Sequence, residues 1–385
     1  MSARVAPAGA ALAAALALLL GAVAPAAAQN LRGFNVPVRD LLECGPSRRS
    51  SRTGAPCATL ADARAAGATV VRLNFALLPL VERAAPHALP AGSRETLREL
   101  VAEAAGLGLR VVIDPHGMPG AARHTTLERD DVFYRRDAAG RRARAALVRL
   151  WTELAREFRG DDTVLAFDLV NEPYDPPPDA PLNALYRRLV RAVAAEDPER
   201  DVILDFHHTH YWLGPGDGAD GHRPREPGWY APPGGADRVR YSTHVYWPLD
   251  YTHQGIAIRR ADGSVVERGA GRRWEDPDST TNGRPWTLDG LSRRLAGVIG
   301  FAEEHGHERM FVGEFSASAC EGCGWEADGG WEEPAGGGAL WLTHATALFD
   351  RHGWDWAYHS LNGASYWSAS LPPRRWGHLE YLFAR

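Results

Sequence analysis

Short apolar runs recur along the chain, and most of them are followed by a helical pattern. They occupy residues 31–37, 69–75, 110–116, 164–172, 201–206, 238–246, 310–315 and 355–360. Several are apolar at consecutive positions and therefore on both faces, which is typical of parallel strands covered by helices on each side. The pattern predicts eight strands of this kind.

Helical patterns lie between the runs. The clearest covers residues 142–159, where apolar residues recur at i, i+3, i+4, i+7 and i+11 on one face. Gly160 then supplies a C-terminal stop. A second pattern includes Leu97 and Leu100, with Ser93 as the expected N-cap. Further helices are predicted near residues 58–66, 182–195, 289–304 and 339–351.

The alternation of strands and helices predicts an α/β fold with a parallel sheet and right-handed crossovers. Eight such units predict a closed (β/α)8 TIM barrel, a fold that routinely exceeds 250 residues as one domain. An open doubly wound sheet is the alternative, but it calls for a Gly-rich first turn, and LRGFNVP at 31–37 has none. We therefore expect a single catalytic domain over residues 29–385.

The first 28 residues have the features of a targeting segment. Arg4 precedes an almost unbroken Ala, Leu and Val run over 8–23, and Ala26–Ala28 fits a small-residue cleavage site. We expect a signal peptide over residues 1–28 and a secreted, extracellular or periplasmic protein. A retained N-terminal anchor is the alternative, although the apolar run is short for a membrane span. Beyond the signal peptide we expect no membrane association.

Composition excludes some classes of chemistry. The net charge of −5 and the lack of a basic stripe argue against a nucleic-acid partner. All 43 basic residues are Arg, so Schiff-base catalysis by Lys and a P-loop Lys are both ruled out. We expect a monomer that needs no cofactor.

Four cysteines allow three disulfide pairings, and disulfides are the default in an exported protein. We favour Cys44–Cys57, which closes a small early loop, together with Cys320–Cys323, which is a tight local bridge. A four-thiolate zinc site is the rival interpretation.

Polar, titratable or aromatic residues follow the apolar part of seven consecutive predicted strands. In chain order these are Arg72 and Asn74; Asp114 and His116; Asn171 and Glu172; His207, His208 and His210; His244, Tyr246 and Trp247; Glu314; and Trp356, Tyr358 and His359. In a TIM barrel the chemistry gathers at these carboxyl ends. Core packing alone would not place such groups at seven ends in succession.

Two of these residues, Glu172 and Glu314, stand on the fourth and seventh predicted strands, which face each other across a barrel. Two opposed carboxylates are what glycosidic cleavage needs, one to protonate the leaving oxygen and one to act at the anomeric carbon. Arg72, His244 and Tyr246 could keep the second carboxylate ionised. A turn or helix cap at Glu172 and a structural buried acid at Glu314 are the plainer alternatives. The 13 Trp residues suit stacking on sugars.

The pieces RGFNVP, VVRLNF, VVIDPHG, LVNEP, HVYWP and VGEF, in this order, resemble glycoside hydrolase family 5, the cellulase family. The resemblance covers essentially the whole chain after residue 28. It implies a retaining double displacement with Glu172 as acid/base and Glu314 as nucleophile. It also implies that Asn171 binds the sugar 2-hydroxyl.

The same resemblance implies roles for the surrounding residues. Arg72 and Tyr246 would orient Glu314 and hold its charge, while His116 and His244 would line the cleft. The family usually places a Trp platform at the end of the eighth strand. Here the segment reads WDWAYHSLNG, so that Trp356, His359 and Trp367 remain alternatives. The DPHGMPG loop and the insertion at 249–288 also depart from the plainest cellulases.

We expect an endoglucanase-like enzyme acting on a β-linked polysaccharide. Mannan, β-1,3-glucan or short oligosaccharides are the alternative substrates for the same mechanism. Two further hypotheses are a barrel that binds sugar without cleaving it, and a metal-dependent hydrolase that uses Asp205 with His207, His208 and His210. Only His208 and His210 could easily converge, because neighbouring strand residues point to opposite faces. We therefore expect no metal.

Overall fold

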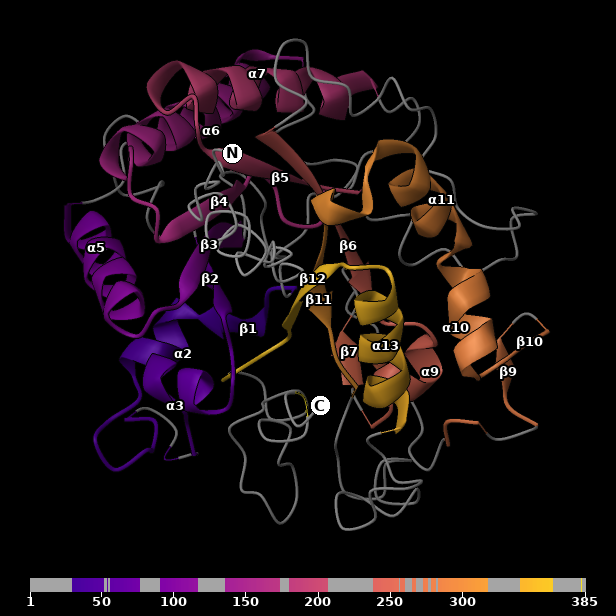
Figure 1. Ribbon diagram of the computed structural model, residues 1–385. Coiled ribbons are helices and arrows are strands. Elements are labelled where there is room, and N and C mark those ends of the chain that lie inside the picture. The colour runs from indigo at the N-terminus through magenta and orange to yellow at the C-terminus, as the bar shows by residue number, and fades with distance from the viewer. Residues whose placement is uncertain are drawn as a thin grey trace, which may run out of the picture. The chain divides into compact units, whose positions relative to one another are not determined.

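The computed structural model describes residues 30–51, 54, 56–76, 91–116, 136–173, 180–206, 238–255, 257–259, 265–267, 273–275, 278–281, 283–317, 340–362 and 382. Leu31–Arg385 forms one compact unit. Within its described residues, eight parallel strands close into a barrel in the order β1-β12-β11-β6-β5-β4-β3-β2 (Figure 1). This architecture confirms the predicted (β/α)8 barrel.

The barrel strands fall where the apolar runs predicted them. They are β1 (Arg32–Pro37), β2 (Val70–Ala76), β3 (Arg110–His116), β4 (Val164–Asp168), β5 (Asp201–Asp205), β6 (Val239–Val245), β11 (Met310–Phe315) and β12 (Asp355–Tyr358). Pairing of β1 with both β2 and β12 completes the closure. The fourth strand is shorter than expected, since it ends at Asp168 and the chain leaves the ladder before Glu172.

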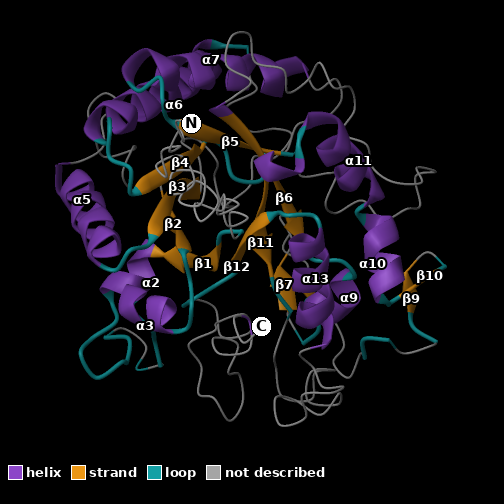
Figure 2. Ribbon diagram, viewed as in Figure 1, coloured by secondary structure: helices purple, strands orange, loops and turns teal. Residues whose placement is uncertain are grey.

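Helices surround the strands (Figure 2). The longer ones are α5 (Ala91–Gly106), α6 (Ala138–Glu157), α7 (Ala180–Glu196), α10 (Leu288–Arg294), α11 (Ala296–His305) and α13 (Leu340–Arg351). The predicted helix at 289–304 is thus two helices, which meet at Leu295. Asp137 caps α6 by accepting from the backbone N–H of Gly140, and the predicted apolar face of this helix is buried.

Shorter elements complete the described chain. They are α2 (Val38–Leu42), α3 (Leu60–Ala65), α9 (Leu249–Thr252), β7 (Ala257–Arg259), β8 (Val265–Glu267), β9 (Thr280–Thr281), β10 (Arg284–Pro285) and η5 (His307–Arg309). The pairs β7–β8 and β9–β10 are small antiparallel sheets within the predicted insertion at 249–288. They therefore belong to a connection between β6 and α10, outside the barrel ladder.

Two apolar clusters divide the core. The larger one packs strands against helices, while the smaller one contains Val70, Val112, Leu165, Ala166, Ile203, Phe311 and Ala357. Strand residues alternate between faces. Most members of the smaller cluster are followed two positions later by Arg72, Asp114, Asp168, Asp205, Gly313 or His359. The barrel interior therefore changes from apolar to polar toward the carboxyl ends of its strands.

Gly33 permits the close approach of β1 and β2. A Cβ atom at this position would lie 1.6 Å from the carbonyl oxygen of Val70. A backbone atom cannot give way as a flexible side chain can. Closure of the barrel at β1 therefore requires glycine here.

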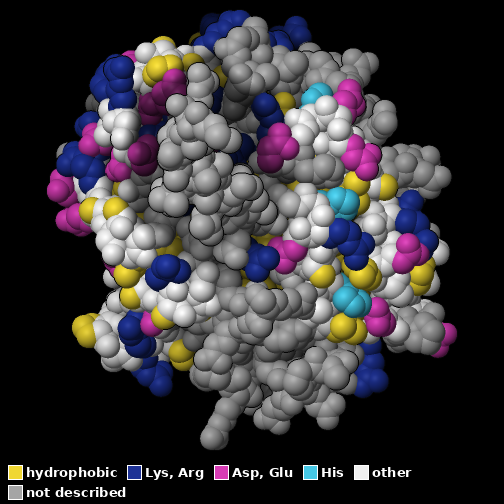
Figure 3. Space-filling view, viewed as in Figure 1, with side chains coloured by type: hydrophobic (Ala, Val, Ile, Leu, Met, Phe, Trp, Pro, Cys, Tyr) yellow, Lys and Arg dark blue, Asp and Glu magenta, His cyan; other side chains and the backbone are white. Residues whose placement is uncertain are grey.

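Cys44 and Cys57 form a disulfide, as predicted, across a separation of 13 residues. The Cys320–Cys323 prediction lies outside the described residues, as does the predicted signal peptide at 1–28. Over the part of the chain that the structure describes, no helix combines the length and apolarity needed to cross a membrane. On the face shown in Figure 3, arginine and acidic side chains of the described residues are interspersed.

Candidate active site

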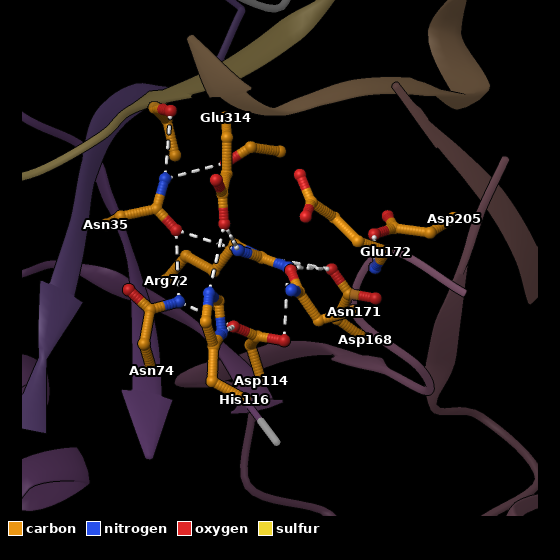
Figure 4. A network of polar contacts seen from close by, with 12 residues as sticks. Asn35, Arg72, Asn74, Asp114, His116, Asp168, Asn171, Glu172, Asp205 and Glu314 are labelled. Atoms are coloured by element: carbon orange, nitrogen blue, oxygen red, sulfur yellow. Dashed lines mark hydrogen bonds and ion pairs between the residues drawn. The ribbon is translucent and has the colours of Figure 1, made fainter. Parts of the chain in front are cut away.

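Arg72 stands at the centre of the polar end of the barrel (Figure 4). Its side chain is fully buried and points inward from β2, two residues after Val70. Its Nε donates to Asp168 Oδ2 at 3.0 Å, and Nη2 donates to Asn171 Oδ1 at 2.8 Å. Its Nη1 donates to Glu314 Oε1 at 3.1 Å. One guanidinium thus ties β2 to β4 and β11.

Two asparagines fix the position of this guanidinium. Asn35 on β1 accepts from Arg72 Nη1 at 2.8 Å and donates to the carbonyls of Gly313 and Ala357 at 2.6 and 3.0 Å. Asn74 donates to Asn35 Oδ1 at 3.0 Å. Both amides are buried, and their Nδ2 groups donate within the network, so they hold the guanidinium in one orientation.

A second chain of contacts reaches Glu314 through His116. Asp114 accepts from Asn74 at 2.5 Å, forms an ion pair with Arg72 at 3.0 Å and contacts His116 Nδ1. The other ring nitrogen of His116, Nε2, lies 3.1 Å from Glu314 Oε1. The carboxylate of Asp114 therefore sets which way the imidazole faces.

Glu314 enters the barrel interior at an irregularity in β11. The pairing of β11 with β6 shifts register between Val312 and Glu314, so that Gly313 and Glu314 are not in simple alternation. A Cβ atom at Gly313 would lie 2.8 Å from His244 Nε2. Glycine at this position thus leaves space for the imidazole. Tyr246 donates its hydroxyl to the other carboxylate oxygen of Glu314, Oε2, at 2.8 Å.

Glu172 follows β4 in an uncommon backbone conformation, with φ at 43°. Its N–H donates to Asp205 Oδ2 at 2.9 Å, and its Oε1 lies 2.8 Å from His244 Nδ1. Both Glu172 and Glu314 are buried, at 7% and 5% exposure. Their side chains come from β11 and from the segment after β4, and their carboxyl groups converge in the barrel mouth (Figure 4).

The two glutamates are close to each other as well as opposed. Glu172, His244 and Glu314 each offer one ligand atom, and these atoms lie within 4.8 Å of one another. In glycosidases that retain the anomeric configuration, the two carboxyl groups are about 5–5.5 Å apart, whereas inverting enzymes need room for a water molecule. One oxygen of Glu172 and one oxygen of Glu314 thus lie within 4.8 Å of each other.

Positive charge gathers around Glu314. Burial acts to raise the pKa of this carboxyl, but the charges of His359, His244 and His116 outweigh burial and hold the pKa well below its usual value. Burial lowers the pKa of His359 itself, so of the three imidazoles it loses its proton at the lowest pH. Glu314 is therefore a carboxylate at neutral pH.

The two other imidazoles keep their protons. Burial opposes the charge on His116, but Asp114 and Glu314 raise its pKa to about 10. Burial likewise opposes the charge on His244, yet Glu314, Asp205 and Glu172 raise its pKa to about 9. Burial and the charges of the two glutamates raise the pKa of Tyr246 well above its usual value, so its hydroxyl remains a donor.

Deeper acids are held differently. Burial and the neighbouring charge of Asp205 raise the pKa of Asp168 well above its usual value. Burial also raises the pKa of Asp205, against the charges of His244 and Arg72. Asp168 and Asp205 thus favour the neutral form more than Glu314 does, whereas Arg72 and His116 lower the pKa of the equally buried Asp114.

The structure brings most of the predicted site residues together. Those that meet in one network are Arg72, His116, Asn171, Glu172, His244, Tyr246, Glu314 and His359. Nδ1 of His359 lies 3.7 Å from Glu314 Oε2, and its ring is parallel to that of His116 with 6.4 Å between centroids. The side chain of His359 is 21% exposed, so one edge faces the opening.

Trp356 requires a correction. Its side chain is fully buried on the helix-facing side of β12, against Phe315, and its indole donates to Asp350 of α13 at 3.3 Å. It therefore cannot stack on a sugar in the barrel mouth. Trp367, and the histidines at 207, 208 and 210, lie outside the described residues.

Three inward-facing residues were not recognised from the sequence as part of this site. The sequence pattern assigns no role to Asn35 and Asp168, and it suggests Asp205 only as a metal ligand. Each lies on the same strand face as a smaller-cluster residue or a glycine two positions earlier. That two-residue spacing is the signal that could have identified them.

The set of Glu172, His244 and Glu314 could also hold a metal ion, because each residue offers a ligand atom. A metal-bound imidazole nitrogen must be free of its proton. The acidic surroundings of His244 raise its pKa to about 9, which favours the protonated ring. Metal binding would thus compete with a proton at Nδ1.

A closed parallel barrel that carries two opposed glutamates at its carboxyl-terminal end is the architecture of a class of glycoside hydrolases. The family model described as Cellulase (glycosyl hydrolase family 5) matches residues 30–365. The chain belongs to this family and is a glycoside hydrolase.

Solved structures share the fold at low sequence identity. A hyperthermophilic endo-beta-1,4-glucanase in complex with substrate is 17% identical, with a TM-score of 0.64 over 91% of this chain and 96% of that chain. Thermotoga maritima Cel5A in complex with mannotriose is 17% identical, with a TM-score of 0.63 over the same shares.

The cellulose synthase subunit Z from Clostridioides difficile is also 17% identical, with a TM-score of 0.60 over 88% of this chain and 94% of that chain. At these identities the likeness concerns the fold alone. No curated protein matches the chain.

Proposed function

We propose that this protein is a secreted, retaining β-glycoside hydrolase that cleaves β-linked glucan internally. The observation that carries the proposal is the pair Glu172 and Glu314, whose oxygens come within 4.8 Å of each other in a buried, donor-rich site. That separation suits a covalent glycosyl–enzyme intermediate better than direct attack by water.

Glu314 is the proposed nucleophile. It is charged at neutral pH, and Arg72, His116 and Tyr246 hold both of its oxygens. One carboxylate oxygen attacks the anomeric carbon, and the bond from that carbon to the glycosidic oxygen breaks. Developing positive charge on the sugar is stabilised by the carboxylate as the new ester bond forms.

Glu172 is the proposed acid/base. In the first step it gives its proton to the glycosidic oxygen, so that the leaving sugar departs as an alcohol. In the second step it takes a proton from water as the water oxygen attacks the anomeric carbon. The ester to Glu314 then breaks, both carboxyl groups return to their starting states, and one glycosidic bond has been hydrolysed.

Neighbouring residues would position the sugar. The Oδ1 of Asn171 accepts from Arg72, which fixes the side chain beside Glu172 and suits it to bind the sugar 2-hydroxyl. His116 and His359 would line the opening above Glu314, with the imidazole of His359 in the place of an aromatic platform. The loops and insertion that would shape the rest of the cleft lie largely outside the described residues.

The family supports a β-linked polysaccharide as substrate, and solved structures of similar fold include endoglucanases. A similar structure holds mannotriose, so mannan is the first alternative, followed by β-1,3-glucan and short oligosaccharides. The proposed export through residues 1–28 is supported by the Cys44–Cys57 disulfide, a bond typical of oxidising compartments. We propose a monomer that acts outside the cytoplasm.

Product release from a panel of soluble polysaccharides tests the proposal. The panel is carboxymethyl-cellulose, mixed-linkage β-glucan, laminarin, glucomannan and galactomannan, each with wild type and Glu314→Ala, with and without chelator. Chelator-insensitive release that Glu314→Ala abolishes supports the two-glutamate mechanism and identifies the substrate class. Loss of release on chelation would favour a metal-dependent hydrolase at Glu172, His244 and Glu314. Sugar binding without any release would favour a non-catalytic barrel.

A further inference from the structure

Asp205 is a buried acid that the proposed reaction leaves without a role. It ends β5, is fully buried, and faces the barrel interior two residues after Ile203. An acidic side chain in such a place is costly unless its oxygens are used. The contacts of Asp205 show which groups its Oδ2 atom binds.

The first contact is with the main chain of Glu172. Its N–H donates to Asp205 Oδ2 at 2.9 Å. Glu172 has a φ of 43°, in the left-handed region that a residue other than glycine seldom adopts. Such a conformation is unfavourable and persists only where surrounding contacts enforce it. The carboxyl of Asp205 is one such contact, and it comes from the neighbouring strand.

The second contact is with His244. Its Nε2 lies 3.4 Å from the same oxygen of Asp205. This distance is long for a hydrogen bond but within the range of an ion pair. Its Nδ1 lies 2.8 Å from Glu172 Oε1. A ring of contacts therefore runs from the N–H of Glu172 to Asp205, through the imidazole of His244, and back to the carboxyl of Glu172.

From this ring we infer that Asp205 is a positioning residue for acid/base catalysis, holding the backbone of Glu172 directly and its carboxyl through His244. The inference rests on the proposed function, because it assigns Asp205 to the residue proposed as acid/base. Asp205 does not touch the sugar. Its effect is to keep the Glu172 carboxyl aimed at the glycosidic oxygen.

The charges around Asp205 are consistent with this role. Arg72 and His244 are positive groups that act on it, the buried Asp168 is an acid that opposes it, and Ser242 of β6 offers a neutral hydroxyl. Burial raises the pKa of Asp205. An amide in its place removes the negative charge that attracts His244 and preserves an oxygen acceptor.

Two variants separate the contacts. Asp205→Asn keeps an acceptor for the N–H of Glu172 but loses the attraction for His244. Asp205→Ala loses both. Because a misplacement of about 1 Å can cost about 100-fold in rate, we expect Asp205→Ala to lower kcat about 100-fold for substrates whose leaving groups need protonation. Asp205→Asn should lie between Asp205→Ala and wild type.

The readout is the dependence of kcat and KM on the leaving group, measured with aryl β-glycosides of graded phenol pKa. A 2,4-dinitrophenyl glycoside needs no proton, so its glycosylation rate should change less than about fivefold in either variant. Asp197→Asn is the matched control, because Asp197 is also buried and ion-paired, with Arg200, but precedes β5 at the opposite end of the barrel. It should leave the leaving-group dependence unchanged.

Burst titration with a 2,4-dinitrophenyl 2-deoxy-2-fluoro-β-cellobioside counts folded active sites through Glu314 alone. A normal burst with a steeper leaving-group dependence in the Asp205 variants supports the inference. A normal burst with equal loss on all substrates, or with no loss, overturns it and leaves the proposed function standing. No burst in wild type would overturn the proposed function, and the role of Asp205 with it.

Discussion

The hydroxyl of Tyr246 donates a hydrogen bond to Oε2 of Glu314 at 2.8 Å, while Arg72 and His116 contact Oε1 of the same carboxylate. Both oxygens of the proposed nucleophile are therefore held before any substrate arrives. Holding of this kind fixes the direction of attack and keeps the carboxylate charged.

Tyr246→Phe removes one of these donors. A hydrogen bond to a charged group contributes about 1.5–3 kcal/mol, so kcat/KM should fall about 10- to 100-fold. The pKa of Glu314 should rise, because it loses a donor to its charged form, and the acid limb of the pH–rate profile should move to higher pH. Tyr241→Phe, on the outward face of the same strand, is the control and should change neither. An unmoved acid limb in Tyr246→Phe would contradict the argument.

Glu172→Gln removes the proposed acid and preserves its shape. General acid catalysis contributes about 100- to 10,000-fold, so glycosides with poor leaving groups should lose activity by that amount. A dinitrophenyl glycoside should still form the glycosyl–enzyme at nearly the wild-type rate. Glu157→Gln, on α6, is the control. Equal losses on every substrate would count against Glu172 as the acid.

The stability of the protein should decline as the pH rises above neutrality. The pKa of His116 is raised from 6.5 to about 10 and that of His244 to about 9, so each binds its proton more tightly in the folded state. This stabilisation is complete below about pH 6.5 and is lost as the pH rises through the folded pKa values. Denaturant titrations from pH 6 to pH 10.5 measure the decline.

His116→Asn should flatten that decline by up to about 1.4 kcal/mol per pH unit between pH 7 and pH 9, which is the contribution of one proton. The remaining slope should come largely from His244. A decline equally steep in both proteins would show that His116 is not protonated in the folded state. Wild type at each pH is the reference.

His359→Trp tests whether the residue at the end of the eighth strand, where the family usually has a Trp platform, faces the sugar. His359 lies at the opening beside Glu314, and a stacked indole contributes about 0.5–1.5 kcal/mol beyond its buried area. KM for cello-oligosaccharides should therefore fall about two- to tenfold, with a smaller change in kcat. His352→Trp, on the turn before β12 at the opposite end of that strand, is the control. An unchanged KM would mean that the side chain at 359 does not face the sugar.

Removing the disulfide tests its contribution to stability. A bond that closes a loop of about 15 residues stabilises a protein by about 3 kcal/mol, and the separation of Cys44 and Cys57 is 13. The Cys44→Ser/Cys57→Ser double variant should lose about that free energy of unfolding while its kcat stays near wild type. A loss of activity greater than the loss of folded protein would place this loop in the substrate cleft.

Strand positions could be predicted because a buried parallel strand is apolar at consecutive positions, which is a local property. The residues at which strands and helices end were harder to predict from the sequence. β4 ends at Asp168, and four residues later Glu172 adopts a φ of 43° while its N–H donates to Asp205, 33 residues away in sequence. The break between α10 and α11 at Leu295 likewise has no local signal as strong as a Pro or Gly.

The glutamates and their nearest donors could be predicted from their places at strand ends. Trp356 could not be placed in this way, because only the alternation along β12 shows that it and Ala357 face opposite sides. Asn35 and Asp168 went unrecognised for a related reason. Their significance lies in contacts with Arg72, which is 37 and 96 residues away, and such contacts exist only after the barrel closes.

Because the contacts of Arg72 form only when the barrel closes, the return of catalytic activity reports that folding is complete. Arg72 meets its partners across sequence separations of 37, 96, 99 and 242 residues, the last to β11. A half-formed barrel would leave this guanidinium without the acids that balance it, and Glu314 without the donors that keep it charged. In a refolding experiment, activity should therefore return together with the last strand pairings, after helix content has recovered.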